Sequence, residues 1–396
     1  MRIDVFFDVY PHPAKPYFES QLTEWQHQGH QLRLFSQSSI ADASSTFTIT
    51  FLRTLRQRPM RLPLMILWRC LTNPTRCRRV FRSTNGLMQR IKVLATDAQL
   101  PRQPPDVHFV HNLATAVSFS YLKCACPRTK LAIYYHGGEI PGVRQIPWEE
   151  ASRALQRADV VFSNTQASIS EAVSRGARAD RTACIPVGFA LERFKLPDSR
   201  DYIPNGCWRF VCLGRMAPEK GFDVALNAFA ALRRKTIGFQ ATFIGAGPEL
   251  ENLKELTNRL QLQDVVRFLG HIDFEKLTPT LAGFDALVLP SRPVQGSTWF
   301  ETQATVMQEA MLMGAIVVAS DIGGVRESLP AALHPYLFTP GSEAELADRL
   351  ASVMQLAREE VRGAGLAARR FVEKNYDIRT INRKLLEMVF PTEPLH

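Results

Sequence analysis

Apolar runs of strand length alternate along the chain with amphipathic stretches of helical length. Residues 2–9 alternate apolar and polar positions, which is typical of a strand, and residues 17–27 form an amphipathic helix that ends near Gly29. Residues 30–36 are a second apolar run, so the chain opens as strand, helix and strand. This order predicts a parallel sheet with helices packed against it.

The same alternation continues to the end of the chain. We expect further strands at residues 107–111, 131–135, 159–162, 183–186, 208–213, 240–244, 265–269, 284–289 and 315–319. We expect further helices at residues 148–157, 168–174, 222–233, 249–260, 274–281, 303–313, 341–356, 358–374 and 378–389. Gly314 directly follows one of these helices, where a left-handed C-terminal cap would lie. The predicted fold class is therefore α/β.

One segment interrupts this pattern and divides the chain. Residues 189–205 are polar, contain prolines and show no strong periodicity, and the strand at 208–213 begins a new Rossmann-like series. A chain of 396 residues with 45% hydrophobic content can supply two cores. We expect an N-terminal domain at 1–190 with a helical insert at 44–93, a linker at 191–207, and a second domain at 208–374.

The composition favours a reduced, cytoplasmic setting. The seven cysteines are scattered, their number is odd, and no two pairs have zinc-ligand spacing. Asp4 and Asp8 lie inside the first apolar run, which excludes a signal peptide. No stretch approaches the ~20 apolar residues that a membrane span needs.

The net charge of +10 is concentrated in the first half of the chain. Residues 1–200 carry 27 Lys and Arg against 15 Asp and Glu, and no acid lies between Asp42 and Asp97. The basic residues of that stretch are Arg53, Arg56, Arg58, Arg61, Arg69, Arg76, Arg78, Arg79, Arg82, Arg90 and Lys92. Bulky apolar residues, including 62–68, lie among them, which is typical of an interfacial helix on an anionic membrane.

Two other interpretations of this basic stretch stay open. Its apolar side could simply be core, or the stretch could bind nucleic acid. We expect no nucleic acid as partner, because the chain has no aromatic stacking motif and no helix-turn-helix pattern. The expected partner is an anionic membrane surface, contacted through residues 51–92 from the cytoplasmic face.

Two glutamates and one loop carry the candidate chemistry. Glu301 and Glu309 are eight residues apart, about 2.2 helical turns, and Glu309 lies among Ala, Val and Met. A carboxylate in such surroundings must reach solvent or hydrogen-bond donors. In the loop 214–221, Arg215 and Lys220 supply a guanidinium fork and an ammonium, which suit a diphosphate. The alternatives are a solvent-facing or amide-bonded Glu309 and ordinary surface charges at a strand-to-helix turn.

These residues resemble the signature of a known enzyme family. Glu301 and Glu309 with seven residues between them, then Gly314 and Val-Val-Ala-Ser at 317–320, look like retaining GT-B glycosyltransferases of the family 4 type, the glycosyl transferases group 1. The pattern Gly-Arg-x4-Lys-Gly at 214–221 resembles the diphosphate clamp of that family. The strand 131–135 followed by His136 and Gly resembles its His-Gly turn, at a strand end where ligands bind.

The resemblance implies a fold, an activity and an acceptor. It implies two Rossmann-like domains facing a central cleft, with a final helix at 375–396 that returns to the N-terminal domain. It implies a hexosyltransferase that moves a sugar, with retention, from a nucleotide-diphosphate sugar to a hydroxyl of a glycan or lipid-linked acceptor. Such an enzyme would act in cell-surface polysaccharide or glycolipid synthesis, with the acceptor held by the N-terminal domain.

The resemblance also implies roles for individual residues. The catalytic set would be His136, Arg215, Lys220 and Glu301. The donor-binding set would be Gly214, Arg215, Lys220, Gly270, His271, Glu301, Thr302, Gln303, Ala304, Thr305, Val306 and Glu309. Glu301 would bind the sugar, Glu309 the ribose, and His136 would donate a hydrogen bond near the reacting carbon. No cofactor and no metal are expected, because the cationic pair takes the place of an Asp-x-Asp metal site.

The chain departs from the family pattern in two places. Residues 302–304 are Thr-Gln-Ala where the family usually has Gly-aromatic-Gly, so the donor sugar is left open. The first loop is Pro-Ala-Lys-Pro at 13–16 instead of a Gly-Gly turn; Lys15 could supply charge there or be a surface lysine.

Two further functions remain as alternatives. A nucleotide-sugar 2-epimerase on the same fold would need additional acid–base carboxylates, and none is identifiable in the sequence. A catalytically inactive protein that binds membrane or nucleic acid is the other, but the intact Arg215, Lys220, Glu301 and Glu309 argue against it.

Overall fold

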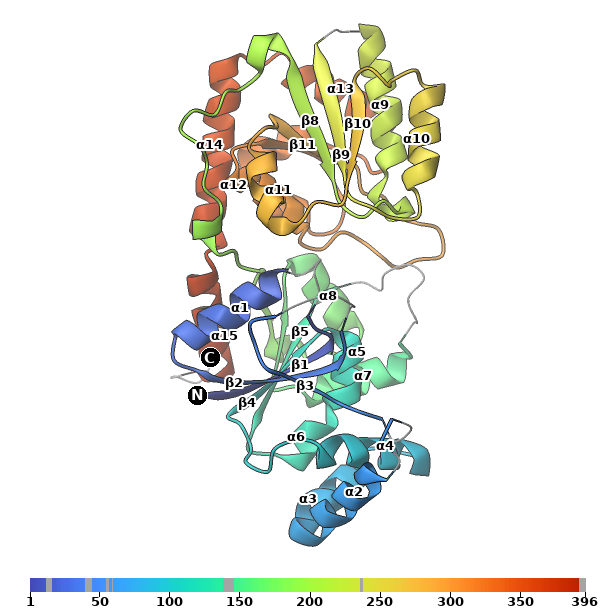
Figure 1. The fold of residues 1–396 in the computed structure, drawn as a ribbon, viewed down its shortest axis with the longest axis vertical. Helices are drawn as coiled ribbons and strands as arrows, with labels where there is room; N and C mark the ends of the chain where they lie inside the picture. Colours follow the sequence, from blue (N-terminus) through green and yellow to red (C-terminus); the bar gives the residue numbers. More distant parts are fainter. Residues whose placement is uncertain are drawn as a thin grey trace. The chain divides into compact units, whose positions relative to one another are not determined.

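The computed structural model describes residues 1–11, 16–39, 45–54, 57–58, 60–137, 146–235 and 238–391. These residues form two compact units, each with its own parallel sheet (Figure 1). The first unit contains Met1–Gly137, residues 146–188 and the chain from Ile378 onwards, and the second contains Phe189–Asp377. The predicted α/β class with two sheet domains is confirmed.

The first unit is built on a parallel sheet with the order β3-β2-β1-β4-β5-β6-β7 among the described strands. The strands are β1 (Arg2–Val9), β2 (Gln31–Ser38), β3 (Ile49–Phe51), β4 (Val107–His111), β5 (Lys130–Tyr135), β6 (Val160–Ser163) and β7 (Thr182–Cys184). The helices are α1 (Pro16–His27), α2 (Arg61–Thr72), α3 (Pro74–Arg82), α4 (Leu87–Ala98), α5 (Leu113–Phe119), α6 (Tyr121–Ala125), α7 (Trp148–Arg157), α8 (Gln166–Ser174) and α15 (Ile378–Val389). All neighbouring strands in this order pair in parallel.

Alternate side chains of these strands enter two separate cores, because successive residues of a strand point to opposite faces. Phe6 and Ile133 join one core, with side chains from α3 to α8. Phe7 and Phe109 join the other, with side chains from α1 and α15. Asn382 of α15 donates to the Gln21 carbonyl of α1 at 2.9 Å, so the last helix of the chain packs in the first unit.

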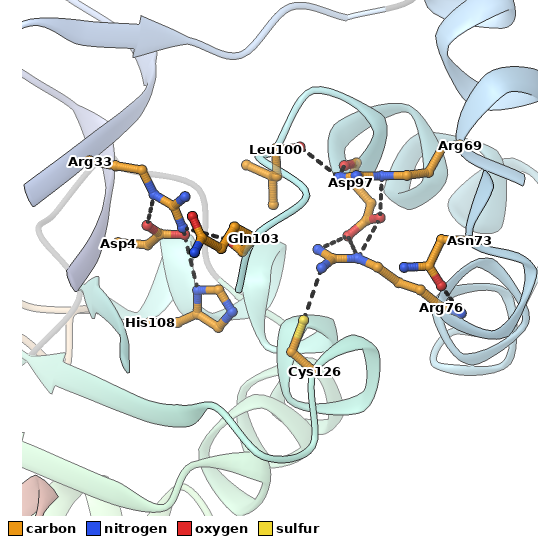
Figure 2. A network of polar contacts seen from close by, with 10 residues as sticks. All are labelled: Asp4, Arg33, Arg69, Asn73, Arg76, Asp97, Leu100, Gln103, His108 and Cys126. Atoms are coloured by element: carbon orange, nitrogen blue, oxygen red, sulfur yellow. Dashed lines mark hydrogen bonds and ion pairs between the residues drawn. The ribbon is translucent and has the colours of Figure 1, made fainter. Parts of the chain in front are cut away.

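The insert between β3 and β4 consists of α2, α3 and α4. Pro74 cannot continue α2, and Asn73 accepts a hydrogen bond from the Arg76 backbone N–H, which caps α3. The three helices are joined by a buried cluster in which Asp97 lies between Arg69 and Arg76 (Figure 2). The short strand β3, which precedes these helices within the predicted insert at 44–93, was not predicted.

The second unit has a parallel sheet with the order β10-β9-β8-β11-β12-β13 among the described strands. The strands are β8 (Trp208–Leu213), β9 (Phe239–Ile244), β10 (Val266–Gly270), β11 (Ala286–Leu289), β12 (Ile316–Ser320) and β13 (Leu337–Phe338). The helices are α9 (Phe222–Lys235), α10 (Leu250–Arg259), α11 (Phe274–Leu281), α12 (Thr305–Leu312), α13 (Glu343–Val353) and α14 (Arg358–Asn375). Short 3-10 turns lie at Leu191–Arg193, Pro204–Gly206, Pro218–Lys220, Arg326–Ser328 and Ala331–Tyr336.

The segment expected to be a linker, 191–207, packs on the second unit. Phe194 and Tyr202 are buried in the core of that unit, and the Arg200 guanidinium donates to the carbonyls of Met313 and Phe284. Residues that look polar and irregular in the sequence are therefore fixed by contacts that are distant along the chain.

Candidate functional site

The order of strands in the second unit marks where a ligand would bind. From β8 the chain proceeds to β9 and β10 on one side of the sheet, and from β11 to β12 and β13 on the other. Open parallel sheets bind ligands beyond the carboxyl ends of their strands at such a switch point. The loops that leave β8 and β11, residues 214–221 and 290–304, therefore define the candidate site.

Lys220 and Glu301 meet between these two loops. The Lys220 ammonium lies 3.0 Å from Glu301 Oε1 and 2.8 Å from Oε2, and the Glu301 side chain is buried. The same ammonium lies 5.2 Å from the ring centroid of Trp299, within the range of a cation–π contact. Two residues predicted separately, one for the diphosphate and one for the sugar, are therefore in direct contact.

Ser291 holds the Glu301 carboxylate from the other side. Its hydroxyl donates to Glu301 Oε2 at 2.7 Å, and its own carbonyl accepts from the Ser320 hydroxyl at 2.5 Å. The Glu301 carbonyl accepts from the Gly324 backbone N–H at 2.8 Å. Sequence reasoning missed Ser291, although it lies two residues beyond the end of β11, where the rule for parallel strands places ligand-binding side chains.

A glycine allows the two loops to approach so closely. Gly221 has φ +62°, and a Cβ atom there would lie 2.1 Å from the Pro290 carbonyl oxygen. Any side chain would therefore push the 214–221 loop away from the end of β11. The position of Lys220 next to Glu301 depends on this glycine.

Arg215 is anchored at one side and open at the other. Its guanidinium pairs with Glu219, whose carboxylate is buried, while about half of the Arg215 side chain is exposed. Glu219 was not among the predicted site residues, but it orients the guanidinium. Gly214 lies at the end of β8, so the whole predicted clamp follows that one strand.

The helix α12 follows Glu301 after Thr302, Gln303 and Ala304. It begins at Thr305, two residues later than predicted, and no side chain caps its N-terminus. The N–H groups at this end, including those of Thr305 and Val306, lie where a helix favours an anion. Residues 302–304 precede the first helical residue, so Glu301 lies ahead of the helix and not on it.

Glu309, one turn inside α12, is a buried carboxylate. Its side chain is only 6% exposed, which excludes the solvent-facing alternative. Burial raises the pKa of Glu309 to about 7. Within the described part of the chain, no side-chain or backbone group forms a hydrogen bond or an ion pair with the Glu309 carboxylate. A ligand hydroxyl or ammonium that reached this carboxylate would therefore be bound strongly.

Gly270 and His271 lie at the end of β10, on the edge of the sheet. His271 is largely exposed, and its Nε2 lies 3.9 Å from Asp273 Oδ1. These residues do not join the Lys220–Glu301 cluster, since two strands, β9 and β8, lie between β10 and β11. Their predicted role with the nucleotide base stays a prediction.

His136 belongs to the first unit, directly after β5. Its Nε2 lies 3.2 Å from Nδ1 of His111 at the end of β4, and its ring stacks on Tyr134 with centroids 4.5 Å apart. A small cavity is lined by both histidines, Tyr17, Tyr134 and Gly188. His111 was not predicted as a site residue. The signal was nonetheless present, because His111 is the last residue of β4, just as His136 directly follows the last residue of β5.

Several predictions lie outside the described residues or stay untested. Lys15 is outside the described residues, and so is Arg56 of the basic stretch. Among the described residues, no three His, Cys, Asp or Glu side chains come close enough together to hold a metal ion. No helix in the same ranges is both long and apolar enough to cross a bilayer.

Comparison with known proteins gives a family match for part of the chain and similar folds over most of it. Residues 208–355 match the family described as Glycosyl transferases group 1. The putative colanic acid biosynthesis glycosyltransferase WcaL of Salmonella typhimurium is 23% identical over 98% of this chain and 99% of its own. The same-named protein of Escherichia coli is 26% identical over 66% of this chain, and the match spans 64% of that relative. The crystal structure of Anabaena Alr3699/HepE in complex with UDP is 19% identical, with a TM-score of 0.71 over 98% of this chain and 99% of that one.

The fold and the matched region define a glycosyltransferase with the GT-B architecture. Residues 208–355 of this architecture match the glycosyl transferases group 1. The matched region contains the loops of Lys220 and Glu301 and the helix of Glu309. The predicted fold and enzyme class are confirmed, whereas retention, the subfamily and the individual residue roles stay predictions.

Proposed function

We propose that the protein transfers a sugar, with retention at the anomeric carbon, from a nucleotide-diphosphate sugar to a hydroxyl of a glycan or lipid-linked acceptor. The reaction would serve polysaccharide or glycolipid synthesis. The observation that carries the proposal is the Lys220–Glu301 pair on Ser291, at the switch point of the sheet. The relatives support it, since WcaL is named for colanic acid biosynthesis and the HepE structure holds UDP.

On binding, the donor would break the Lys220–Glu301 ion pair and form its own contacts with each of the two side chains. The Lys220 ammonium binds a diphosphate oxygen, and the Glu301 carboxylate then accepts hydrogen bonds from sugar hydroxyls. Ser291 keeps Glu301 in place during this exchange, because its hydroxyl bonds Oε2 independently of Lys220. Holding the sugar in one orientation lowers the entropic cost of reaction.

Positive charge at the diphosphate would favour its departure. Negative charge builds up on the leaving diphosphate as the bond to the sugar breaks. Lys220, the exposed half of Arg215 and the N–H groups at the start of α12 are fixed donors for that charge. In this proposal no metal and no other cofactor takes part.

Glu309 and His136 would complete the set. Glu309 accepts the ribose hydroxyls, since a carboxylate without a protein partner offers both oxygens to a ligand. His136, from the first unit, donates a hydrogen bond to the sugar near the reacting carbon. No side chain is assigned as general base; the donor phosphate itself would accept the proton of the acceptor hydroxyl.

The first experiment is a nucleotide screen by thermal unfolding. UDP, GDP and ADP are added separately to the full chain, and a nucleotide at 100 times its dissociation constant should stabilise the fold by about 2.7 kcal/mol. Lys220→Met should abolish the shift. NMR of the product formed from the matching nucleotide-sugar then reads the anomeric configuration. Stabilisation by no nucleoside diphosphate, or a product of inverted configuration, would contradict the proposal.

A further inference from the structure

One face of the insert is apolar and exposed. We define the α2 outer face as Leu64, Leu67, Trp68 and Leu71, whose spacing of three and four residues forms a single stripe along the helix. These side chains are 66%, 57%, 60% and 70% exposed. Met60, just before α2, and Leu87 and Met88, at the start of α4, are also largely exposed. An exposed stripe of this size on a folded domain marks an interaction surface.

Buried contacts on the opposite side of α2 fix the rotation of the helix about its axis. Leu62 and Arg69 lie on that side, and both are buried. The Arg69 guanidinium donates to the backbone carbonyls of Asp97 and Leu100 at 2.7 and 2.6 Å, and its Nε lies 3.5 Å from Asp97 Oδ2. Figure 2 shows Arg69 directed towards Asp97 and Leu100. The α2 outer face lies on the other side of the helix from Arg69, because its four residues are largely exposed and Arg69 is buried.

The same cluster uses the one carboxylate of the insert. Asp97 is the only acidic residue between Asp42 and Asp106. Arg76 binds it through Nε at 3.0 Å and through a terminal nitrogen at 2.7 Å, and Asp97 is fully buried. Arg69 and Arg76 are thus structural residues, and no acidic group is left on the surface of the insert.

The remaining basic residues are on the surface. The exposed members are Arg61, Arg78, Arg79, Arg82 and Lys92. Within the described ranges, no ion pair joins any of them to a carboxylate. Two more arginines lie against exposed aromatic rings: Arg102 is 5.4 Å from the Trp68 centroid and Arg90 is 4.5 Å from that of Phe81. Apolar and cationic groups are therefore interleaved on the insert.

We propose that the α2 outer face and the exposed basic residues of the insert bind the surface of an anionic lipid bilayer. Leucines and a tryptophan on one stripe would enter the boundary between head groups and acyl chains. The arginines and the lysine would attract anionic head groups, each contributing through the negative surface potential. The proposal does not depend on the transferase reaction, because it concerns an insert with its own fixed structure.

Other occupants fit the charges less well. A second copy of the chain would bring one basic, acid-free surface against another, and like charges disfavour that contact. A nucleic acid would match the charge but would leave the leucine stripe in water. An anionic bilayer satisfies the cationic and the apolar groups together.

Sedimentation with vesicles tests the proposal on the full chain. Wild type should pellet with vesicles of phosphatidylcholine plus phosphatidylglycerol and not with phosphatidylcholine alone. Binding should weaken as salt rises and shortens the electrostatic range. The variant Arg78→Gln, Arg79→Gln, Arg82→Gln should lose on the order of 100-fold in the partition coefficient, at roughly tenfold or less per residue. Leu64→Ser with Leu67→Ser and Leu71→Ser should weaken binding at low salt as well.

Two controls make the result specific. Arg234→Gln, Arg259→Gln, Arg370→Gln removes the same charge from exposed positions of the second unit and should leave binding unchanged. Quenching of tryptophan fluorescence by brominated lipid should be seen in wild type and lost in Trp68→Phe. Thermal unfolding of every variant confirms that the fold is intact, since all changed side chains are exposed.

Three outcomes would overturn the proposal. The first is equal pelleting with neutral and anionic vesicles. The second is an equal loss of binding in the insert variant and its second-unit control. The third is tighter binding to a duplex DNA or an RNA oligonucleotide than to anionic vesicles, with the arginine variant defective only for the nucleic acid.

Discussion

The ammonium of Lys220 lies 2.8 Å from Glu301 Oε2, although 81 residues separate the two positions along the chain. Each belongs to a loop at the carboxyl end of a strand, and the two strands, β8 and β11, are neighbours in the sheet. The ion pair therefore joins the two loops at the switch point of the second unit. A donor that binds there must separate the two charges and satisfy both.

Removing the cation should affect turnover and stability in different ways. In Lys220→Met, kcat should fall by ~100-fold or more, the scale of one lost preorganised contact to developing charge. The fold should also be destabilised, because Glu301 loses its cation in a buried position. The double variant Lys220→Met with Glu301→Gln should recover stability but not kcat. Steady-state kinetics and denaturant unfolding measure both quantities; wild-type turnover in Lys220→Met would remove this residue from the mechanism.

Ser291 should act on the reaction through Glu301. Ser291→Ala removes the hydroxyl that holds Oε2, so kcat should fall while the free energy of unfolding drops by only about 1 kcal/mol. Ser83→Ala is the matched control, since Ser83 is also buried and donates to a carbonyl, that of Val80, at 2.6 Å. The control should lose similar stability and no activity. Equal kinetics in the two variants would show that Ser291 is only structural.

Glu309 should make stability depend on pH. Burial raises its pKa from 4.5 to about 7. Below pH 4.5, Glu309 is protonated in both the folded and the unfolded protein. Above pH 4.5, Glu309 ionises in the unfolded protein but stays protonated in the folded one, so the free energy of unfolding falls as pH rises towards 7. Glu309→Gln removes this effect. The free energy of unfolding of the variant, relative to wild type, should therefore rise by up to about 3 kcal/mol across that interval. Denaturant unfolding at several pH values measures it, and a constant difference would mean that Glu309 does not titrate there.

Asp97 should be essential for the fold of the insert. Asp97→Asn leaves the buried guanidiniums of Arg69 and Arg76 without their carboxylate, and removing one partner of a buried ion pair costs roughly 3–5 kcal/mol. Arg79→Gln, on the exposed side of α3, should change stability by less than about 0.5 kcal/mol. Thermal unfolding distinguishes the two. A stable Asp97→Asn variant would mean that hydrophobic contacts alone hold the three helices.

Activity should not require a metal ion. Arg215, Lys220 and the N–H groups of α12 supply the positive charge in the proposed mechanism, so transfer should continue in excess EDTA. The measurement is product formation before and after chelation, with a known metal-dependent transferase as control. Loss of activity that magnesium or manganese restores would contradict the assignment.

The sequence predicted most elements to within two residues, because strands buried on both faces read as short apolar runs. Through their resemblance to a family signature, it also proposed Glu301, Glu309 and the 214–221 loop as site candidates, and their roles stay predictions. It could not show that Lys220 and Glu301 touch, since that contact depends on the order of strands in the sheet. Nor could it separate Arg69 and Arg76 from the exposed arginines, because apolar residues occur on both sides of α2. In the structure, the two buried guanidiniums are those that pair with the buried carboxylate of Asp97.

The contact between His111 and His136 restricts where their protons can be. Nδ1 of His111 and Nε2 of His136 are 3.2 Å apart, so one nitrogen must donate and the other must accept. A neutral imidazole carries one N–H. If His136 is to donate from Nδ1 to a sugar, its Nε2 must accept, and His111 must be the tautomer protonated on Nδ1. The buried His111 would then decide whether Nδ1 of His136 is a donor or an acceptor.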